Sequence, residues 1–190
     1  MTLDRKKVGV FNRNFRENRY MADIYIFDID GCIMPNLFQN FKEFKDDSEI
    51  PNFQIKDKVA NLHIFPEFLD FYKRNCSNSL AVYFITGRKR TEYGEITERQ
   101  LNPLKKSKRF FLKFYPENKS HFKKDYFDWK YNIITRIINY HLREFENIYI
   151  YDDFEDIISR LRDTTSLNHQ VHCSLIQKQT DWILKQIQIF

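Results

Sequence analysis

Acidic and hydroxyl side chains follow three apolar segments of the sequence, each near the point where the segment ends. They are Asp28 with Asp30, Thr86, and Asp152 with Asp153. Carboxylates that lie close together repel one another, so they tolerate proximity only when a cation joins them. Because hard oxygen ligands favour Mg²⁺ over softer metals, these residues predict a magnesium site, provided that the three segments end at one place.

The pattern of the rest of the chain predicts how those segments are placed. Strand-like runs rich in β-branched and aromatic residues cover residues 22–27, 80–85, 110–115, 148–151 and 171–176. Segments of helical period alternate with them at 66–74, 91–101, 129–143, 155–161 and 180–187. This alternation predicts an α/β fold with a mostly parallel five-stranded sheet between helices, in which ligands bind beyond the carboxyl ends of the strands.

Length and composition predict a single soluble domain. The chain has 190 residues, of which 42% are hydrophobic and 30% charged. Its apolar runs are shorter than the ~20 residues of a membrane helix, and its three cysteines lack paired spacing. We therefore expect a cytoplasmic protein with no membrane association and no disulfide-linked partner.

The positive charge is concentrated at the start of the chain. Residues 1–20 hold six Lys or Arg against two acidic residues, a net charge of +4 out of +5 for the whole chain. We interpret this segment as a basic N-terminal extension and residues 21–190 as the domain. Such an extension either raises solubility or attracts nucleic acid by releasing counterions from it.

The positions of the four glycines exclude two common phosphate-binding loops. Neither G-x-G-x-x-G nor G-x-x-x-x-G-K-[ST] occurs in the sequence. Gly31 and Gly87 instead follow the acidic and hydroxyl residues directly, where a backbone that turns toward a ligand would use glycine.

The segments F-D-I-D-G, I-T-G-R and I-Y-I-Y-D-D, with a lysine before the last of them, resemble the four motifs of the haloacid dehalogenase (HAD) superfamily of phosphotransferases. The resemblance spans about residues 22–160 and implies a Rossmann-like HAD fold, Mg²⁺ as cofactor, and a phosphatase that works through an aspartyl-phosphate intermediate. The T-G-R segment, the lysine and the Y-D-D ending are also similar to the HAD domains of RNA-repair and polynucleotide phosphatase proteins.

The resemblance implies roles for the polar residues of the first two motifs and for the backbone near Gly87. Asp28 would be the nucleophile that attacks phosphorus, and Asp30 the general acid and base. Thr86, with the backbone N–H groups near Gly87, would hold the phosphoryl oxygens. Arg88 would line the mouth of the site and bind substrate phosphate.

The same resemblance implies the metal ligands and the lysine. Mg²⁺ would be held by Asp28, the backbone carbonyl of Asp30, and Asp152 and Asp153, with the direct ligand among the last two left open. Five lysines lie between residues 113 and 130. Lys130 is the preferred one, because it is predicted to open the helix that leads into the strand before Asp152 and would offset charge on the phosphoryl group.

The motifs are closer together than in HAD proteins with a cap domain, which usually needs more room, so the resemblance implies little or no cap. Only 55 residues separate Asp30 from Thr86, and 43 separate Thr86 from Lys130. Residues 34–65 would form either a surface loop with one short helix or a lid. An open site suits a bulky substrate, so we expect a phosphomonoesterase acting on a nucleotide or a nucleic-acid terminal phosphate. Two alternatives stay open, a capless phosphoprotein or small-metabolite phosphatase and a non-catalytic nucleic-acid-binding module of the same fold.

Overall fold

The structure, a computed structural model, describes residues 23–36, 56–105, 109–119, 122–141, 147–165 and 170–187. Its centre is a parallel five-stranded sheet of order β3-β2-β1-β4-β5. The strands are β1 Ile24–Asp28, β2 Ala81–Lys89, β3 Phe110–Tyr115, β4 Ile148–Asp152 and β5 Val171–Leu175. The predicted α/β fold with five strands is thus confirmed, whereas the basic extension predicted at residues 1–20 lies outside the described residues.

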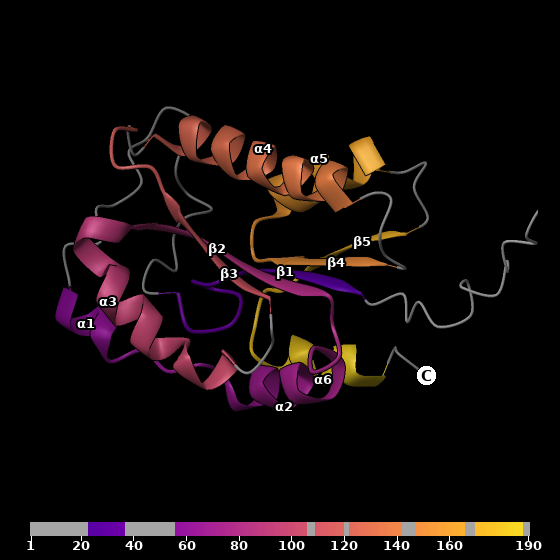
Figure 1. The fold of residues 1–190 in the computed structure, drawn as a ribbon, viewed down its shortest axis with the longest axis horizontal. Coiled ribbons are helices and arrows are strands. Elements are labelled where there is room, and N and C mark those ends of the chain that lie inside the picture. The colour runs from indigo at the N-terminus through magenta and orange to yellow at the C-terminus, as the bar shows by residue number, and fades with distance from the viewer. Residues whose placement is uncertain are drawn as a thin grey trace, which may run out of the picture.

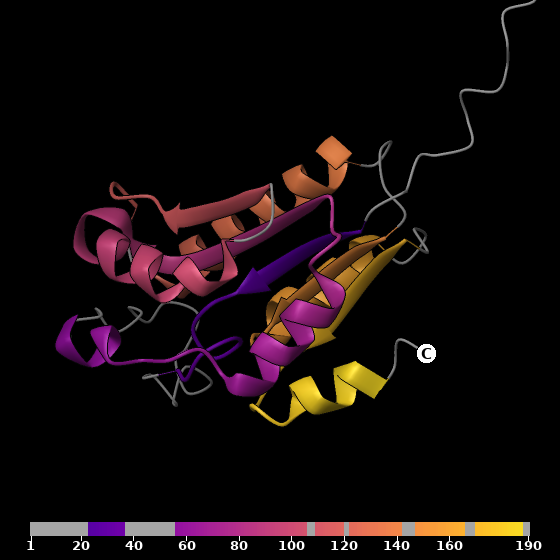
Figure 2. The same cartoon turned by 60° about the horizontal axis from the view of Figure 1, so that its bottom comes forward.

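Helices cover both faces of the sheet (Figure 1). One face carries α4 Lys123–His141 and α5 Glu155–Thr165, and the other carries α2 Pro66–Asn75, α3 Arg90–Gln100 and α6 Asp181–Ile187. Two short helices complete the described chain, α1 Lys56–Ala60 next to α3 and the 3-10 turn η3 Asn102–Leu104. Figure 2 shows α2 and α6 side by side under the sheet. Within the described residues, no helix is both long and apolar enough to cross a membrane.

The central strand β1 shows why two apolar cores form. Successive side chains of a strand point to opposite faces of the sheet. Ile24 and Ile26 accordingly belong to the core under α4 and α5, whereas Tyr25 and Phe27 belong to the core under α2 and α6. All four are buried, as expected for a strand covered on both faces.

Two elements extend further than the sequence pattern predicts. Strand β2 continues to Lys89, because it pairs with β3 again after a bulge between Thr86 and Lys89. Helix α4 begins at Lys123 and not at Trp129. Its first turns are rich in charged residues, which conceal the apolar periodicity there.

The loop after β1 is held by a hydrogen bond of its own and by contacts from distant parts of the chain. The backbone N–H of Gly31 donates to Met34, and that of Phe65 donates to Ile33. The indole N–H of Trp182, in α6, donates to the carbonyl of Cys32 at 2.8 Å. The C-terminal helix therefore helps to fix the loop that follows Asp28. Of the possible lid at residues 34–65, residues 37–55 lie outside the described residues.

Candidate active site

Three carboxylates meet where the central strands β1 and β4 end. The strands are parallel neighbours, with Phe27 paired to Tyr151, so Asp28 and Asp152 end at the same edge of the sheet. Asp153 follows at once, and one oxygen from each of the three lies within 4.8 Å of the others. Asp28 and Asp152 are only 3% and 1% exposed, so their charges have little access to water.

Lys130 is the cation that balances part of this charge. Its Nζ lies 2.8 Å from Asp28 Oδ1 and 2.6 Å from Asp152 Oδ2, and the side chain is fully buried. Burial alone would lower the pKa of Lys130, but the carboxylates of Asp152 and Asp28 outweigh it and raise the pKa well above its usual range. The sequence pattern predicted that Lys130 opens this helix. That prediction is wrong, because α4 begins at Lys123 and Lys130 lies about two turns into it.

One ammonium opposes three carboxylates, so the cluster carries excess negative charge. Burial raises the pKa of Asp28 well above its usual range, while Lys130 opposes the shift. Burial, and next the charge of Asp152, raise the pKa of Asp153 to about 7. Such upward pKa shifts arise when buried carboxylates outnumber the cations beside them. Binding of a proton or a metal ion balances the excess negative charge.

The oxygen atoms that remain free fit a hard cation. Asp152 uses both of its oxygens, because Oδ2 pairs with Lys130 and Oδ1 accepts from the backbone N–H of Phe154 at 3.0 Å. Asp153 Oδ1 is buried without a hydrogen-bond partner in the described structure, and its Oδ2 accepts a long bond of 3.4 Å from Asn36. Of the two adjacent aspartates, Asp153 therefore has an oxygen to offer to a metal, whereas Asp152 orients Lys130.

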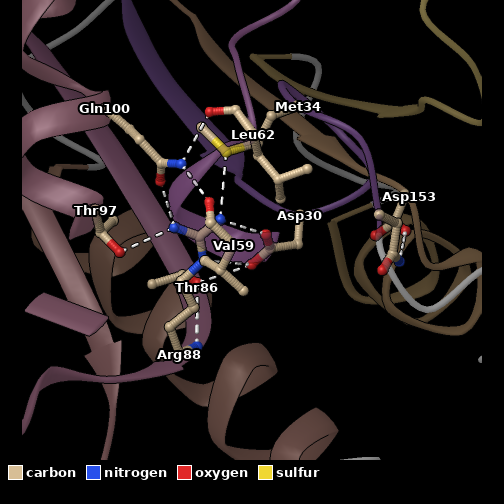
Figure 3. A network of polar contacts seen from close by, with 10 residues as sticks. Asp30, Met34, Val59, Leu62, Thr86, Arg88, Thr97, Gln100 and Asp153 are labelled. Carbon is tan, nitrogen blue, oxygen red and sulfur yellow. Dashed lines mark hydrogen bonds and ion pairs between the residues drawn. The ribbon is translucent and has the colours of Figure 1, made fainter. Parts of the chain in front are cut away.

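Asp30 belongs to a second polar group beside this cluster. Its Oδ1 accepts from Arg88 Nη2 at 2.6 Å and its Oδ2 from Arg88 Nε at 3.0 Å. Thr86 Oγ1 lies 3.4 Å from the same Oδ2. Figure 3 shows the Asp30 carboxylate turned toward Arg88, with Asp153 on its other side. Arg88 was expected to line an open mouth, but its side chain is fully buried and points toward α3.

Two aromatic residues that sequence reasoning missed surround the ammonium of Lys130. The ring centroids of Tyr126 and Phe154 lie 5.4 and 5.6 Å from Nζ, a distance at which ring faces attract cations. Tyr126 also lies against Gly87, where an added Cβ would be 3.1 Å from its ring. Tyr126 precedes Lys130 by one helical turn, so this neighbour could have been expected once the helix was placed.

Gly31 has a backbone that other residues rarely adopt, and replacing it is expected to damage the site. Its φ is +86°, and an added Cβ would collide with Asp153 Oδ2 and lie 2.7 Å from Cγ. We expect Gly31→Ala to lower the free energy of unfolding by about 2 kcal/mol or more. Urea denaturation would measure this loss.

Gly94→Ala is the matched control for this substitution. Gly94 lies inside α3, where its added Cβ would be 3.2 Å from Cγ of the long Arg90 side chain, which can move aside. Alanine favours a helix interior over glycine by up to about 1 kcal/mol, so this variant should be at least as stable as the wild type. Equal stability of Gly31→Ala and wild type would contradict the positive φ of Gly31 and its close approach to Asp153.

Comparison with known proteins supports the same architecture. No family model matches the chain, and no curated protein matches it in sequence. The solved structure of the HAD domain of effector protein Lem4 from Legionella pneumophila superposes with a TM-score of 0.53 and covers 88% of this chain and 94% of its own. The two sequences are 15% identical, so the likeness shows the fold. The protein therefore has a HAD-type, Rossmann-like fold.

Proposed function

We propose that this protein is a Mg²⁺-dependent phosphomonoesterase that forms an aspartyl-phosphate intermediate. The observation that supports this most is the buried cluster in which Lys130 pairs with Asp28 and Asp152 beside the under-coordinated Asp153. A phosphoryl group carries negative charge spread over its oxygens, and a site for its transfer needs cations beside a nucleophile. The HAD-type fold supports the proposal, and Asp28 and Lys130 are the nucleophile and the cation that such a transfer needs.

In this proposal Asp28 and Asp30 act in two successive steps. A carboxylate oxygen of Asp28 attacks phosphorus and forms the acyl phosphate while the bond to the leaving oxygen breaks, and Asp30 gives that oxygen a proton. Asp30 then takes a proton from the water that attacks the acyl phosphate. Inorganic phosphate leaves, and Asp28 is regenerated as a carboxylate.

The surrounding groups would hold the phosphoryl oxygens in place. The Lys130 ammonium lies beside Asp28, where it offsets negative charge during transfer. The Thr86 hydroxyl and the backbone N–H near Gly87 complete the set of donors in this proposal. Both lie on the bulged end of β2, next to β1 in the sheet.

The donor set fits Mg²⁺. Asp28, Asp153 and the backbone carbonyl of Asp30 would hold the ion, with Asp152 beside them, since carboxylate and carbonyl oxygens are the ligands that Mg²⁺ takes in proteins. When bound, the ion supplies positive charge next to the transferred phosphoryl group and balances the excess charge of the cluster.

For the substrate we propose a nucleotide or a nucleic-acid terminal phosphate. The basic residues between positions 1 and 20 would attract a phosphate-bearing polymer electrostatically. The motif resemblance to RNA-repair and polynucleotide phosphatases favours the same class. In that case, turnover of a phosphorylated oligonucleotide should exceed that of the mononucleotide and fall as salt increases.

The first experiment measures phosphate release from p-nitrophenyl phosphate with Mg²⁺ and with EDTA. Turnover that requires the metal supports the proposal and leads to a screen of 3′- and 5′-phosphorylated oligonucleotides, nucleotides and phosphopeptides. Preference for phosphopeptides or small metabolites would replace the proposed substrate class. No turnover of any of them, together with no Mg²⁺ binding, would favour a non-catalytic module.

Mg²⁺ binding is expected to depend on pH, because Asp153 must lose a proton first. Burial and the charge of Asp152 raise its pKa from 3.8 to about 7. In the metal-free protein, the stability that this carboxyl contributes is complete below its usual pKa and is lost as the pH rises through about 7. The affinity for Mg²⁺ should therefore increase between pH ~5 and ~7 and level off above.

Calorimetric titration of the metal-free protein at pH ~5.5 and ~8, in buffers of different ionisation enthalpy, would measure this. Proton release on Mg²⁺ binding should be found at the lower pH and be nearly absent at the higher one. Asp153→Asn should bind weakly at both. Equal affinity of the wild type at both pH values would contradict the role of Asp153.

A further inference from the structure

The guanidinium of Arg88 has no N–H left for a substrate. Arginine has five side-chain donors. Nε and one N–H of Nη2 donate to Asp30, and the other N–H of Nη2 points to Met34 Sδ at 3.3 Å. The two N–H groups of Nη1 donate to Thr97 Oγ1 at 3.0 Å and to Gln100 Oε1 at 2.7 Å (Figure 3). Arg88 therefore does not have the free donors that a phosphate ligand needs.

The side-chain amide of Gln100 likewise uses its oxygen and both of its N–H groups in hydrogen bonds, and it links Arg88 to another part of the chain. Its Oε1 accepts from Arg88, and its Nε2 donates to the backbone carbonyls of Val59 at 2.7 Å and Leu62 at 2.9 Å. The orientation of the amide is determined, because a guanidinium can only donate and carbonyls can only accept. A continuous set of hydrogen bonds thus runs from Asp30 through Arg88 and Gln100 to the end of α1.

The different burial of Arg88 and Asp30 fits a role in which Arg88 supports a reacting carboxylate. The Arg88 side chain is fully buried, whereas the Asp30 side chain is 12% exposed. The carboxylate can therefore meet a reactant on its open side while the guanidinium holds it from behind. Each carboxylate oxygen has a second lone pair, so Asp30 can carry a proton while both oxygens accept from Arg88.

We propose that Arg88 and Gln100 are positioning residues that hold Asp30 where it exchanges protons with the leaving group and with water. This inference rests on the proposed function, in which Asp30 is the general acid and base. It replaces the expectation that Arg88 binds the substrate phosphate. Arg88 supplies a fork that fits both carboxylate oxygens, and Gln100 fixes the plane of that fork.

Kinetics of Arg88→Met separate a positioning role from a substrate-binding role. Loss of positioning should lower kcat by about 10²-fold or more and leave KM nearly unchanged, because correctly placed acid–base groups contribute ~10²–10⁴-fold. Inorganic phosphate should inhibit the variant as well as it inhibits the wild type. A rise in KM and in the phosphate inhibition constant, with kcat retained, would overturn the proposal.

The leaving group provides a readout that a general structural defect would not change. An alkoxide leaves poorly without a proton, whereas p-nitrophenolate leaves readily. The loss of kcat should therefore be larger with an alkyl phosphate than with p-nitrophenyl phosphate, and more phosphoenzyme should accumulate with the latter. Equal losses on both substrates, without accumulation, would contradict a defect in Asp30.

Milder variants keep the test decisive if Arg88→Met folds poorly. Arg88→Lys should recover only part of kcat, because an ammonium cannot form the fork. Gln100→Met should lower kcat by about tenfold with the same dependence on leaving group. Arg99→Met, an exposed arginine beside Gln100 in α3, is the matched control and should behave as the wild type.

The outcomes also distinguish the inference from the proposed function. Wild-type protein without turnover that depends on Asp28 would overturn both. An active wild type whose Gln100→Met and Arg88→Lys variants keep full kcat on alkyl phosphates would overturn only the positioning role. Thermal unfolding of each variant, with and without Mg²⁺, would show whether the fold and the metal site persist.

Discussion

Asp28→Asn is expected to abolish phosphate release, with a loss of at least about 10³-fold in kcat, because an amide cannot attack phosphorus to form the acyl phosphate. The loss should be the same for every substrate that the wild type accepts. Steady-state kinetics with Mg²⁺ would measure it, and rapid acid quenching followed by intact mass measurement would show phosphate on the wild type alone.

The same variant should fold at least as well as the wild type. Asn has nearly the size of Asp, and the substitution removes one negative charge from a cluster in which burial already raises the pKa of Asp28. Lys130 keeps its second partner, Asp152, at 2.6 Å. Loss of activity with unchanged or higher stability is the relation expected at a catalytic group that its surroundings destabilise.

Asp70→Asn is the control for this prediction. Asp70 lies on α2, and its side chain is 58% exposed. The control should keep full activity and nearly unchanged stability, since exposed positions contribute little. Turnover by Asp28→Asn that still requires Mg²⁺ would show that another group is the nucleophile and would contradict the assignment of Asp28.

Lys130→Met is expected to destabilise the protein and to inactivate it. The substitution leaves Asp28 and Asp152 buried without their cation, and removing one partner of a buried ion pair costs about 3–5 kcal/mol. Methionine has similar length and fits between the rings of Tyr126 and Phe154, so loss of packing is minor. Chemical denaturation would measure the loss, and phosphate release would measure the inactivation.

Conditions that neutralise the carboxylates should restore part of that stability. Mg²⁺ does so by supplying positive charge, and a pH near 5 does so by protonation, since the pKa of both Asp28 and Asp153 is raised. Lys73→Met is the matched control, because Lys73 is exposed and forms a loose surface pair at 3.9 Å with Asp70. A Lys130→Met protein as stable as the control at every pH and Mg²⁺ concentration would contradict the buried pairing.

The arrangement of the fold could be predicted from the sequence to a large extent. Strand-length runs of β-branched and aromatic residues are buried on both faces of a parallel sheet, and their order along the chain requires crossover helices. The ends of the elements were less predictable. Strand β2 passes through a bulge to Lys89, and the charged first turns of α4 hide a buried Tyr126.

The supporting contacts of the candidate site could not be predicted. Trp182 holds the carbonyl of Cys32 from 150 residues away, and Gln100 holds carbonyls near α1. Neither residue belongs to a motif, and the contacts of each depend on how distant elements pack against one another. Local spacing carries no information on such contacts.

The sequence by itself determined that Asp28 and Asp152 end two of the strands and that Thr86 lies near the end of a third. It could do so because strand-forming runs and the turns after them are local properties. Only the tertiary structure decided which charges pair. It places Lys130 between Asp28 and Asp152, and it buries Arg88 against Asp30. The physical reason is that the energy of an ion pair depends on distance and burial, and both are set by elements that are far apart along the chain.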